Sequence, residues 1–234
     1  MRQIALDTET TGLYPEKGDR IIEIAAVEIL NRRVTKNAWH RYVNPERDVP
    51  ADSVRIHGIT TERLQNEPLF AALADDFLDF IDGAELIIHN AAFDVSFLNM
   101  ELSRANKPTL ESVTSKITDT VALAKKTLPG KGYSLDGLCD FYHIDRAART
   151  QHGALIDTEL LAQVYLALTR GQDSLFAFAE AASAPAKNDG QDAGEKVYKK
   201  TKIIRASETE LAAHEATLAA IAKKSGSPAL WQNL

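Results

Sequence analysis

The sequence has little cysteine and no long apolar run, and each absence excludes a class of protein. The single cysteine, Cys139, cannot form an intrachain disulfide framework or a cysteine-based zinc cluster, and it suits a reducing compartment. No apolar run approaches the ~20 residues of a membrane span, and no apolar signal segment precedes the first acidic residues. We therefore expect a soluble cytoplasmic protein.

An excess of positive charge is also absent. The chain has 27 Lys and Arg residues against 33 Asp and Glu residues, which gives a net charge of −6. Non-specific affinity for nucleic acids comes mainly from Lys and Arg side chains that neutralise phosphates, so this balance argues against a broad nucleic-acid-binding face. Hydrophobic residues make up 44% of the 234 residues, which is ordinary for a globular protein and excludes a disordered chain.

Composition divides the chain into three parts. Residues 181–195 contain no hydrophobic side chain larger than alanine, so they predict a flexible linker. A main domain is expected over residues 1–180 and a small C-terminal segment over residues 196–234. Residues 195–234 carry seven Lys and Arg against four Glu, so this end of the chain is basic while the remainder is acidic.

The hydrophobic pattern of the main domain predicts strands first, then alternating strands and helices. This order is typical of an α/β fold with a mixed central β-sheet flanked by helices. Strands are expected at residues 3–9, 20–30, 39–43 and 85–89, and helices at residues 69–81, 92–105, 120–127, 134–142 and 153–169.

The C-terminal segment has its own pattern. Residues 196–204 predict a short strand, and the capping-box pattern of residues 207–210 predicts a helix that ends before Gly226. The side chains that share the apolar side of this helix are Leu211, His214, Leu218 and Ile221. A short helix with one apolar side is marginal in water, so we expect that side to be buried on a partner.

Two acidic residues lie together in the first predicted strand. Asp7 and Glu9 are two residues apart, so both carboxylates project from the same face of the sheet. Next to the apolar Ile4 and Leu6 they would repel and desolvate each other unless a cation lay between them. A divalent cation such as Mg²⁺, which takes oxygen ligands, is the favoured explanation. An edge strand with solvated acids is the alternative.

Three further residues extend this pair. Asp94 lies at the start of a helix that follows a buried strand, where α/β proteins place ligands, although an Asp there also favours the helix dipole. His152 precedes a helix and Asp157 lies one turn inside it, so their side chains can meet; a solvated His and a helix-favouring Asp are the alternative. Four carboxylates and one His are the parts of two-metal phosphoryl chemistry, in which the His removes a proton from water.

Three blocks of the sequence resemble the motifs of the DEDDh family of 3'-5' exonucleases, and most closely those of bacterial replicative proofreading subunits. The blocks are LDTETTG (6–12), HNAAFDVSFL (89–98) and HGALIDTELLAQVY (152–165), with SLDGLC (134–139) and RIHGIT (55–60) also similar. Their ordered combination is specific, whereas each block alone is weak. The resemblance implies a ribonuclease-H-like exonuclease fold. It also implies removal of mispaired 3'-terminal nucleotides from DNA as deoxynucleoside 5'-monophosphates.

The resemblance further implies a role for each site residue. Two divalent ions, Mg²⁺ or Mn²⁺, would be bound directly by Asp7, Glu9 and Asp157 and through water by Asp94, with His152 as the general base. The residues expected at the terminal nucleotide are Asp7, Glu9, Thr10, Thr11, Gly12, Asp52, His57, Phe93 and Asp157. Asp52 matches a position where the family often has Glu. For His57, His89 and Phe93, a structural role in the core is the alternative.

Two segments resemble partner-binding elements of the same subunits. Gln172, Leu175 and Phe176 match the bacterial sliding-clamp-binding pentapeptide, although such a pattern also arises by chance. Residues 196–234, with Trp231 as an aromatic anchor, resemble the segment that binds the catalytic (alpha) subunit of the polymerase. A small accessory subunit is a further candidate partner. The net negative charge is then acceptable, because bound cations meet the phosphates and another subunit holds the DNA.

Two other functions stay open at this point. The chain could be a stand-alone exoribonuclease of the same family, although such an enzyme does not need a linker and a basic C-terminal segment. It could also be an assembly module that bridges polymerase and clamp with a vestigial nuclease, although all five candidate catalytic residues are present. We expect the proofreading exonuclease.

Overall fold

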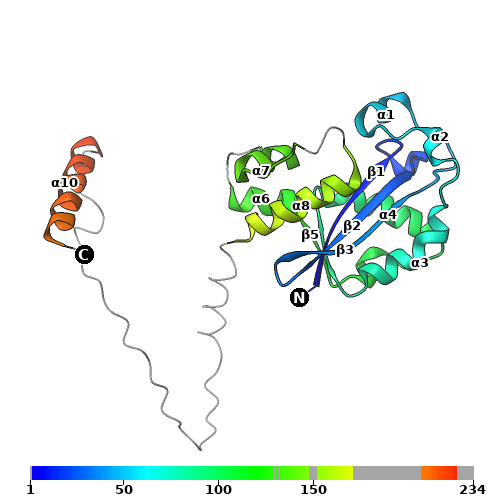
Figure 1. Cartoon of the computed structure of the whole chain (residues 1–234), viewed down its shortest axis with the longest axis horizontal. Coiled ribbons are helices and arrows are strands. Elements are labelled where there is room, and N and C mark those ends of the chain that lie inside the picture. Colours follow the sequence, from blue (N-terminus) through cyan, green and yellow to red (C-terminus); the bar gives the residue numbers. More distant parts are fainter. Residues whose placement is uncertain (1, 129, 131, 148–151, 171–206, 226–234) are drawn as a thin grey trace, which may run out of the picture. The chain divides into compact units, whose positions relative to one another are not determined.

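The computed structural model describes residues 2–128, 130, 132–147, 152–170 and 207–225 (Figure 1). The chain divides into two units, residues 1–184 and residues 185–234, and each is described by itself. The predicted linker, the predicted strand at 196–204 and the three clamp-motif residues lie outside the described residues. None of the described helices combines the length and apolar character that a membrane crossing needs.

Unit 1 is built on a five-stranded sheet in the order β3-β2-β1-β4-β5. Its strands are β1 (Arg2–Thr10), β2 (Ile21–Leu30), β3 (Arg33–Tyr42), β4 (Glu85–Ile88) and β5 (Lys116–Asp119). β1 pairs antiparallel with β2 and parallel with β4, so the sheet is mixed, as predicted. The central strands are apolar on both faces because helices cover both faces.

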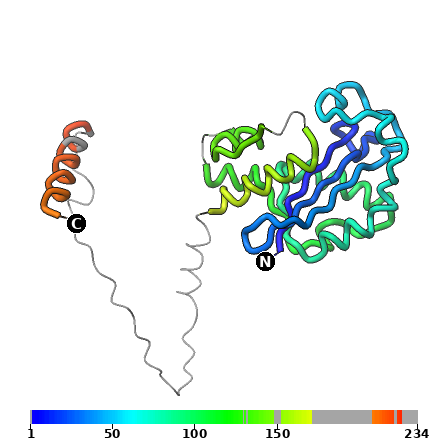
Figure 2. The backbone as a smooth tube through the Cα atoms, viewed as in Figure 1, coloured from blue at the N-terminus to red at the C-terminus, as the bar shows by residue number. Residues whose placement is uncertain are grey.

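The helices of unit 1 surround this sheet, and both of its faces are covered (Figure 2). They are η1 (Pro15–Lys17), α1 (Ala51–His57), α2 (Thr61–Leu64), α3 (Phe70–Ile81), α4 (Ala91–Arg104), α5 (Leu110–Val113), α6 (Thr120–Thr127), α7 (Leu135–Tyr142) and α8 (Ala154–Leu168). α3 and α4 pack on the face that carries Ile4 and Leu6. α8 packs on the opposite face, against Ala5, and is itself covered by α6 and α7.

The predicted strands and helices of the main domain are all present, with shifts at their ends. β3 begins at Arg33 and is longer than expected. Its first residues were missed because they are mostly exposed and polar, so they show no hydrophobic pattern. Three short helices (α1, α2 and α5) and the edge strand β5 were not predicted. Elements of four to seven residues are too short for a periodic pattern to distinguish them from loops.

In unit 2, α10 (Glu208–Ser225) confirms the helix predicted from the capping box. The Ser207 N–H donates to Glu210 Oε2 at 2.8 Å, and the Glu210 N–H donates to Ser207 Oγ at 3.3 Å. On its predicted apolar side, Leu211 and His214 are exposed and Leu218 is buried. The side chain of Ile221 is not described.

Candidate active site

The site begins at the C-terminal half of β1, where side-chain alternation separates the two faces of the sheet. Ile4 and Leu6 enter the core under α3 and α4, whereas Ala5 packs against α8. Asp7 and Glu9 continue the series of Ala5, so they lie on the face that α8 covers. The observed strand therefore places both carboxylates on one face of the sheet, as expected.

α8 brings the last two predicted residues to this face. Its first turn carries Asp157, and the helix packs on β1 and β2. His152 lies just before the helix, with its Nδ1 3.2 Å from Asp157 Oδ2. Glu9, His152 and Asp157 each place one atom that could bind a metal ion within 4.8 Å of the other two. The fold therefore brings together predicted residues that lie near the start and near the end of the domain's sequence.

Asp94 reaches β1 from the other side, because β4 is short. β4 ends at Ile88, which is the partner of Leu6, and Asn90 then turns the chain into α4 with a left-handed φ of 63°. Asp94 Oδ1 accepts the Thr8 N–H at 3.1 Å and the Thr8 hydroxyl at 2.7 Å. A carboxylate thus takes the place beside β1 that a longer β4 would occupy.

Two acids of the site, Asp7 and Asp94, have a raised pKa. The pKa of Asp7 lies well above its ordinary value, first because of burial and then because of the carboxylates of Asp94, Glu9, Asp157 and Glu23. Burial also raises the pKa of Asp94 to about 7, although the hydrogen bonds from Thr8 oppose the shift. Buried carboxylates held together against their repulsion are the donor set that a hard divalent cation neutralises, so these residues fit such an ion.

Removal of divalent cations is expected to leave a folded state that loses stability as the pH rises from about 4 to about 7. Asp94 has a folded pKa of about 7 against an ordinary value of 3.8. Across this window the folded chain keeps a proton that the unfolded chain has released, so its stabilisation is lost as the pH approaches the folded pKa. Thermal unfolding in EDTA measures this loss.

The Asp94→Asn variant provides the control for that experiment, because its side chain cannot titrate. Its melting temperature should depend less on pH than that of the wild type over the same range. If the two chains in EDTA showed the same pH dependence, the Asp94 carboxyl would not be the titrating group.

A cavity of about 470 Å³ extends from Glu9 past the end of β1. Besides Glu9 it is lined by Thr8, Thr10, Thr11, Gly12, Leu13, Asp19, Pro50, Asp52, Ser53, Ile56, His57 and Phe93. This lining includes every residue predicted at the terminal nucleotide that is not also a metal-site acid, namely Thr10, Thr11, Gly12, Asp52, His57 and Phe93. The volume is within the range of small-molecule sites.

His57 presents a defined donor at this cavity. Its Nδ1 accepts the Ile59 N–H at 3.0 Å, so the ring proton lies on Nε2. Nε2 is buried, and the ring also interacts with the backbone of Thr10. Burial lowers the pKa of His57, which favours the neutral ring with Nε2–H as the donor. His57 thus has a buried ring that is bonded to backbone within the chain, and it also lines the cavity.

The Thr10–Gly12 segment uses its hydroxyl groups within the chain. The Thr10 hydroxyl donates to the Gly12 carbonyl at 2.6 Å, and the Thr11 hydroxyl accepts the Arg20 N–H at 3.0 Å. At Gly12 a Cβ would lie 2.3 Å from Asp19 Oδ2, so a larger residue there would have to displace the Asp19 carboxylate. Each of these three residues therefore has a structural role in the loop, independent of any contact with substrate.

The other predicted contacts differ in their surroundings. Asp52 is exposed at the rim and pairs with Arg55 on α1. Phe93 lines the cavity and also packs on Phe97, with ring centroids 4.9 Å apart, so its two proposed roles are compatible. His89 hydrogen-bonds to the Thr120 hydroxyl at 2.9 Å. It lines a separate cavity of about 240 Å³ with Asp7, His152 and Asp157.

Glu23 is a site residue that the sequence did not predict. It lies in β2 directly opposite Glu9, and it is buried. Its charge is one cause of the raised pKa of Asp7. The signal in the sequence was an acid between Ile22 and Ile24, inside a strand that is otherwise apolar.

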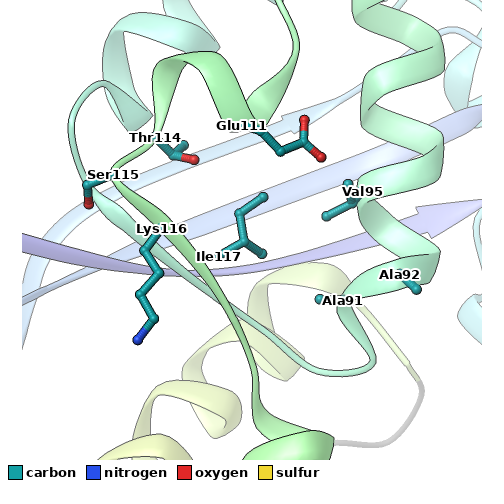
Figure 3. Close-up of a pocket in the computed structure, with 8 residues that line it drawn as sticks. All are labelled: Ala91, Ala92, Val95, Glu111, Thr114, Ser115, Lys116 and Ile117. Carbon is teal, nitrogen blue, oxygen red and sulfur yellow. The ribbon is translucent and has the colours of Figure 1, made fainter.

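A further cavity of about 310 Å³ lies away from these acids, between α4, α5 and β5 (Figure 3). Its lining consists of Ala91, Ala92, Val95, Glu111, Thr114, Ser115, Lys116 and Ile117. The only ionisable groups among them are Glu111 and Lys116, and none of the gathered carboxylates is included. We therefore do not count this cavity as part of the candidate site.

Comparison with known proteins agrees with this geometry. The model of the exonuclease family matches residues 4–165. The chain is 46% identical over 239 residues to DNA polymerase III subunit epsilon of Escherichia coli (strain K12), across 99% of this chain and 97% of that protein. A solved structure of exonuclease X in complex with 5' overhanging duplex DNA is similar at a TM-score of 0.57, with 24% identity over 73% of this chain and 93% of that chain. The zinc ion bound form of the E. coli ExoI-ssDNA complex is similar at a TM-score of 0.64, with 19% identity over 77% of this chain and 43% of that chain. The likeness to the two solved structures shows the fold.

Proposed function

Because the chain belongs to the exonuclease family, and within it to the DNA polymerase III epsilon subunits, we propose that it proofreads DNA synthesis. Its reaction is the hydrolysis of the 3'-terminal phosphodiester of single-stranded or frayed DNA, with release of deoxynucleoside 5'-monophosphates. The observation that carries the proposal is the meeting of Glu9, His152 and Asp157 within 4.8 Å, beside a cavity that Glu9 also lines.

The exonuclease family depends on divalent metal ions, and the acids at the end of β1 fit that requirement. We assign Asp7, Glu9 and Asp157 as direct ligands and Asp94 as a ligand through water, for two ions that are Mg²⁺ or Mn²⁺. When bound, the ions lower the pKa of the attacking water and neutralise charge on the leaving oxygen. The protein holds the four carboxylates in place from β1, α4 and α8.

His152 is the proposed general base. A carboxylate can only accept, so the contact between His152 Nδ1 and Asp157 Oδ2 at 3.2 Å requires the proton on Nδ1. Nε2 then has the lone pair that takes the proton of the attacking water. The His152 side chain is 51% exposed, so water and substrate can reach it.

The cavity beside Glu9 is the proposed site of the terminal nucleotide. Phe93 offers a ring face on which any base can stack, which suits an enzyme that must accept all four bases. His57 offers its Nε2–H as a donor, and Asp52 lies at the rim. Thr10, Thr11 and Gly12 form the wall next to Glu9.

His57→Ala is expected to raise KM for single-stranded DNA about 5- to 10-fold, which is the effect of losing one hydrogen bond of about 1 kcal/mol. The value of kcat should change less, because the carboxylates and His152 are untouched. His214→Ala, which removes an exposed histidine of unit 2, is the control and should leave both constants unchanged. An unchanged KM in His57→Ala would remove His57 from the nucleotide site.

The proposed function is tested by release of mononucleotides from a 3'-labelled single-stranded DNA, with Mg²⁺ or with EDTA. Metal-dependent release of mononucleotides supports the proposal, and release of longer fragments contradicts it. A matched RNA oligonucleotide distinguishes the exoribonuclease, which would cut RNA faster than DNA. No release with any divalent metal would favour an assembly module instead.

We also propose how the remaining chain takes part. Residues 1–180 would be the exonuclease domain, residues 181–195 a linker, and residues 196–234 the segment that binds the polymerase catalytic (alpha) subunit. The similarity to the E. coli subunit supports this, because it extends over 99% of the chain. Co-elution of the full chain with a bacterial polymerase III catalytic subunit, and its loss after deletion of residues 196–234, would test this interaction.

Two further partners belong to the same proposal. Gln172, Leu175 and Phe176 would bind the sliding clamp, and a small accessory subunit could bind the exonuclease domain. These interactions would place the protein in the cytoplasmic replisome of a bacterium.

A further inference from the structure

Glu23 is a buried acid at the site, and it is not one of the proposed metal ligands. It lies directly opposite Glu9 in the antiparallel pairing of β1 and β2, so both side chains leave the sheet on the same face. Its side chain is 4% exposed. Like charges opposite each other destabilise a sheet, so the carboxylate of Glu23 needs partners of its own.

Both oxygens of Glu23 have partners in other elements. Oε1 lies 2.6 Å from Nε2 of His40 on β3. Oε2 accepts the backbone N–H of Ala154, the first residue of α8, at 3.1 Å. The ring of His40 in turn packs edge-on against Tyr42, with centroids 5.2 Å apart. Glu23 therefore connects two strands of the sheet to the start of α8.

The start of α8 has no cap of its own. Its N-cap residue is Gly153, which has no side chain to accept an N–H of the first turn. Glu23 supplies that acceptor from β2, and its negative charge lies at the end of the helix that favours anions. The His152 N–H donates to the Ile56 carbonyl at 3.4 Å, which is a long hydrogen bond. The bond from Glu23 to Ala154 is the shorter anchor near His152.

We propose that Glu23 is a positioning residue for His152, and that His40 holds Glu23 in turn. The contacts run from His40 to Glu23 to Ala154 and end two residues from His152. A cavity of about 280 Å³ is lined by Glu23, His40 and His152 among others, so the His152 ring borders open space here, and its direction depends on its backbone anchor together with its contact with Asp157. This inference rests on the proposed role of His152 as general base.

Glu23→Ala is expected to lower kcat on single-stranded DNA about 10- to 100-fold, the usual effect of losing a residue that orients a site group. KM for DNA and the Mg²⁺ concentration that gives half the maximal rate should stay unchanged, because the metal-site carboxylates and the nucleotide cavity are intact. Glu23→Gln should recover most of the rate, because its amide oxygen can still accept the Ala154 N–H. Glu23→Met removes the acceptor with little loss of volume and gives the same test if the Ala variant does not fold.

Two comparisons separate positioning from general stability. In a His152→Ala background, Glu23→Ala should lower kcat by less than about twofold, because both changes remove the same function. Glu85→Ala is the matched control: Glu85 is equally buried in β4, opposite Gln3 near the start of β1, and is bonded to Gln3 and Thr118. It should lower the melting temperature and leave kcat unchanged.

The outcomes distinguish this inference from the proposed function. A wild-type kcat in folded Glu23→Ala and Glu23→Met, a full further loss in the His152→Ala background, or no recovery in Glu23→Gln would overturn the role of Glu23. The proposed function would fail instead if the wild type released no nucleotides, or if His152→Ala retained full activity.

Discussion

Asp7→Asn is expected to abolish turnover and yet to raise the melting temperature of the metal-free chain. The Asp7 carboxylate lies among four other acids, which together with burial raise its pKa well above the ordinary value. An amide of the same shape carries no charge, so the repulsion disappears from the folded state. Each kcal/mol gained corresponds to a rise of about 2–4 °C in a domain of this size.

The same change should lower kcat about 10³-fold or more, because it removes a proposed direct ligand and with it several kcal/mol of transition-state stabilisation. The two measurements are nucleotide release with Mg²⁺ and thermal unfolding in EDTA. Asp79→Asn on the exposed side of α3 is the control and should change neither. Normal activity in Asp7→Asn would show that the metal assignment is wrong. A lower melting temperature in EDTA would show that the chain itself satisfies the Asp7 carboxylate.

His152→Ala is expected to lower kcat by about 10²- to 10⁴-fold, which is the usual contribution of a general base. KM should change little, because His152 is not among the residues that line the nucleotide cavity. The His152 side chain is 51% exposed, so a small base from solvent can enter the space left by the imidazole. Added imidazole should therefore restore part of the rate of the variant.

His214→Ala serves again as the control, and neither its rate nor its response to imidazole should differ from those of the wild type. If the His152→Ala variant turned over within about twofold of the wild type, the proton would have to be taken by another group. A loss confined to KM would instead make His152 a substrate-binding residue.

Much of the site was predictable because it follows from local periodicity. The alternation of Ala5, Asp7 and Glu9 along one strand determines the face on which the acids lie, and the strand-to-helix order before Asp94 determines where that residue emerges. Both patterns depend only on neighbouring residues, and the structure reproduces both. The same holds for the capping box of α10, whose reciprocal hydrogen bonds join residues three apart.

The remainder depends on contacts between distant residues, which a single sequence does not reveal. The partners of Glu23 are His40 and Ala154, which lie 17 and 131 residues away. The use of the Thr11 hydroxyl by Arg20 is similarly visible only after the loop between β1 and β2 has closed. The short helix α1, which carries His57, has too few residues to show a helical period.

β4 ends early, at Ile88, and this end limits how the length of the strand can vary. Because β4 stops opposite Leu6, the Thr8 N–H is available to aim Asp94 instead of bonding to a neighbouring strand. The aim of this carboxylate therefore depends on the length of β4 as well as on the Thr8 hydroxyl, which donates to the same oxygen. Exchanges among apolar residues within β4 alter stability alone, whereas the insertion of a residue pair after Ile88 would extend the ladder and displace α4. Variation in this family should thus be restricted in the residue count of this strand.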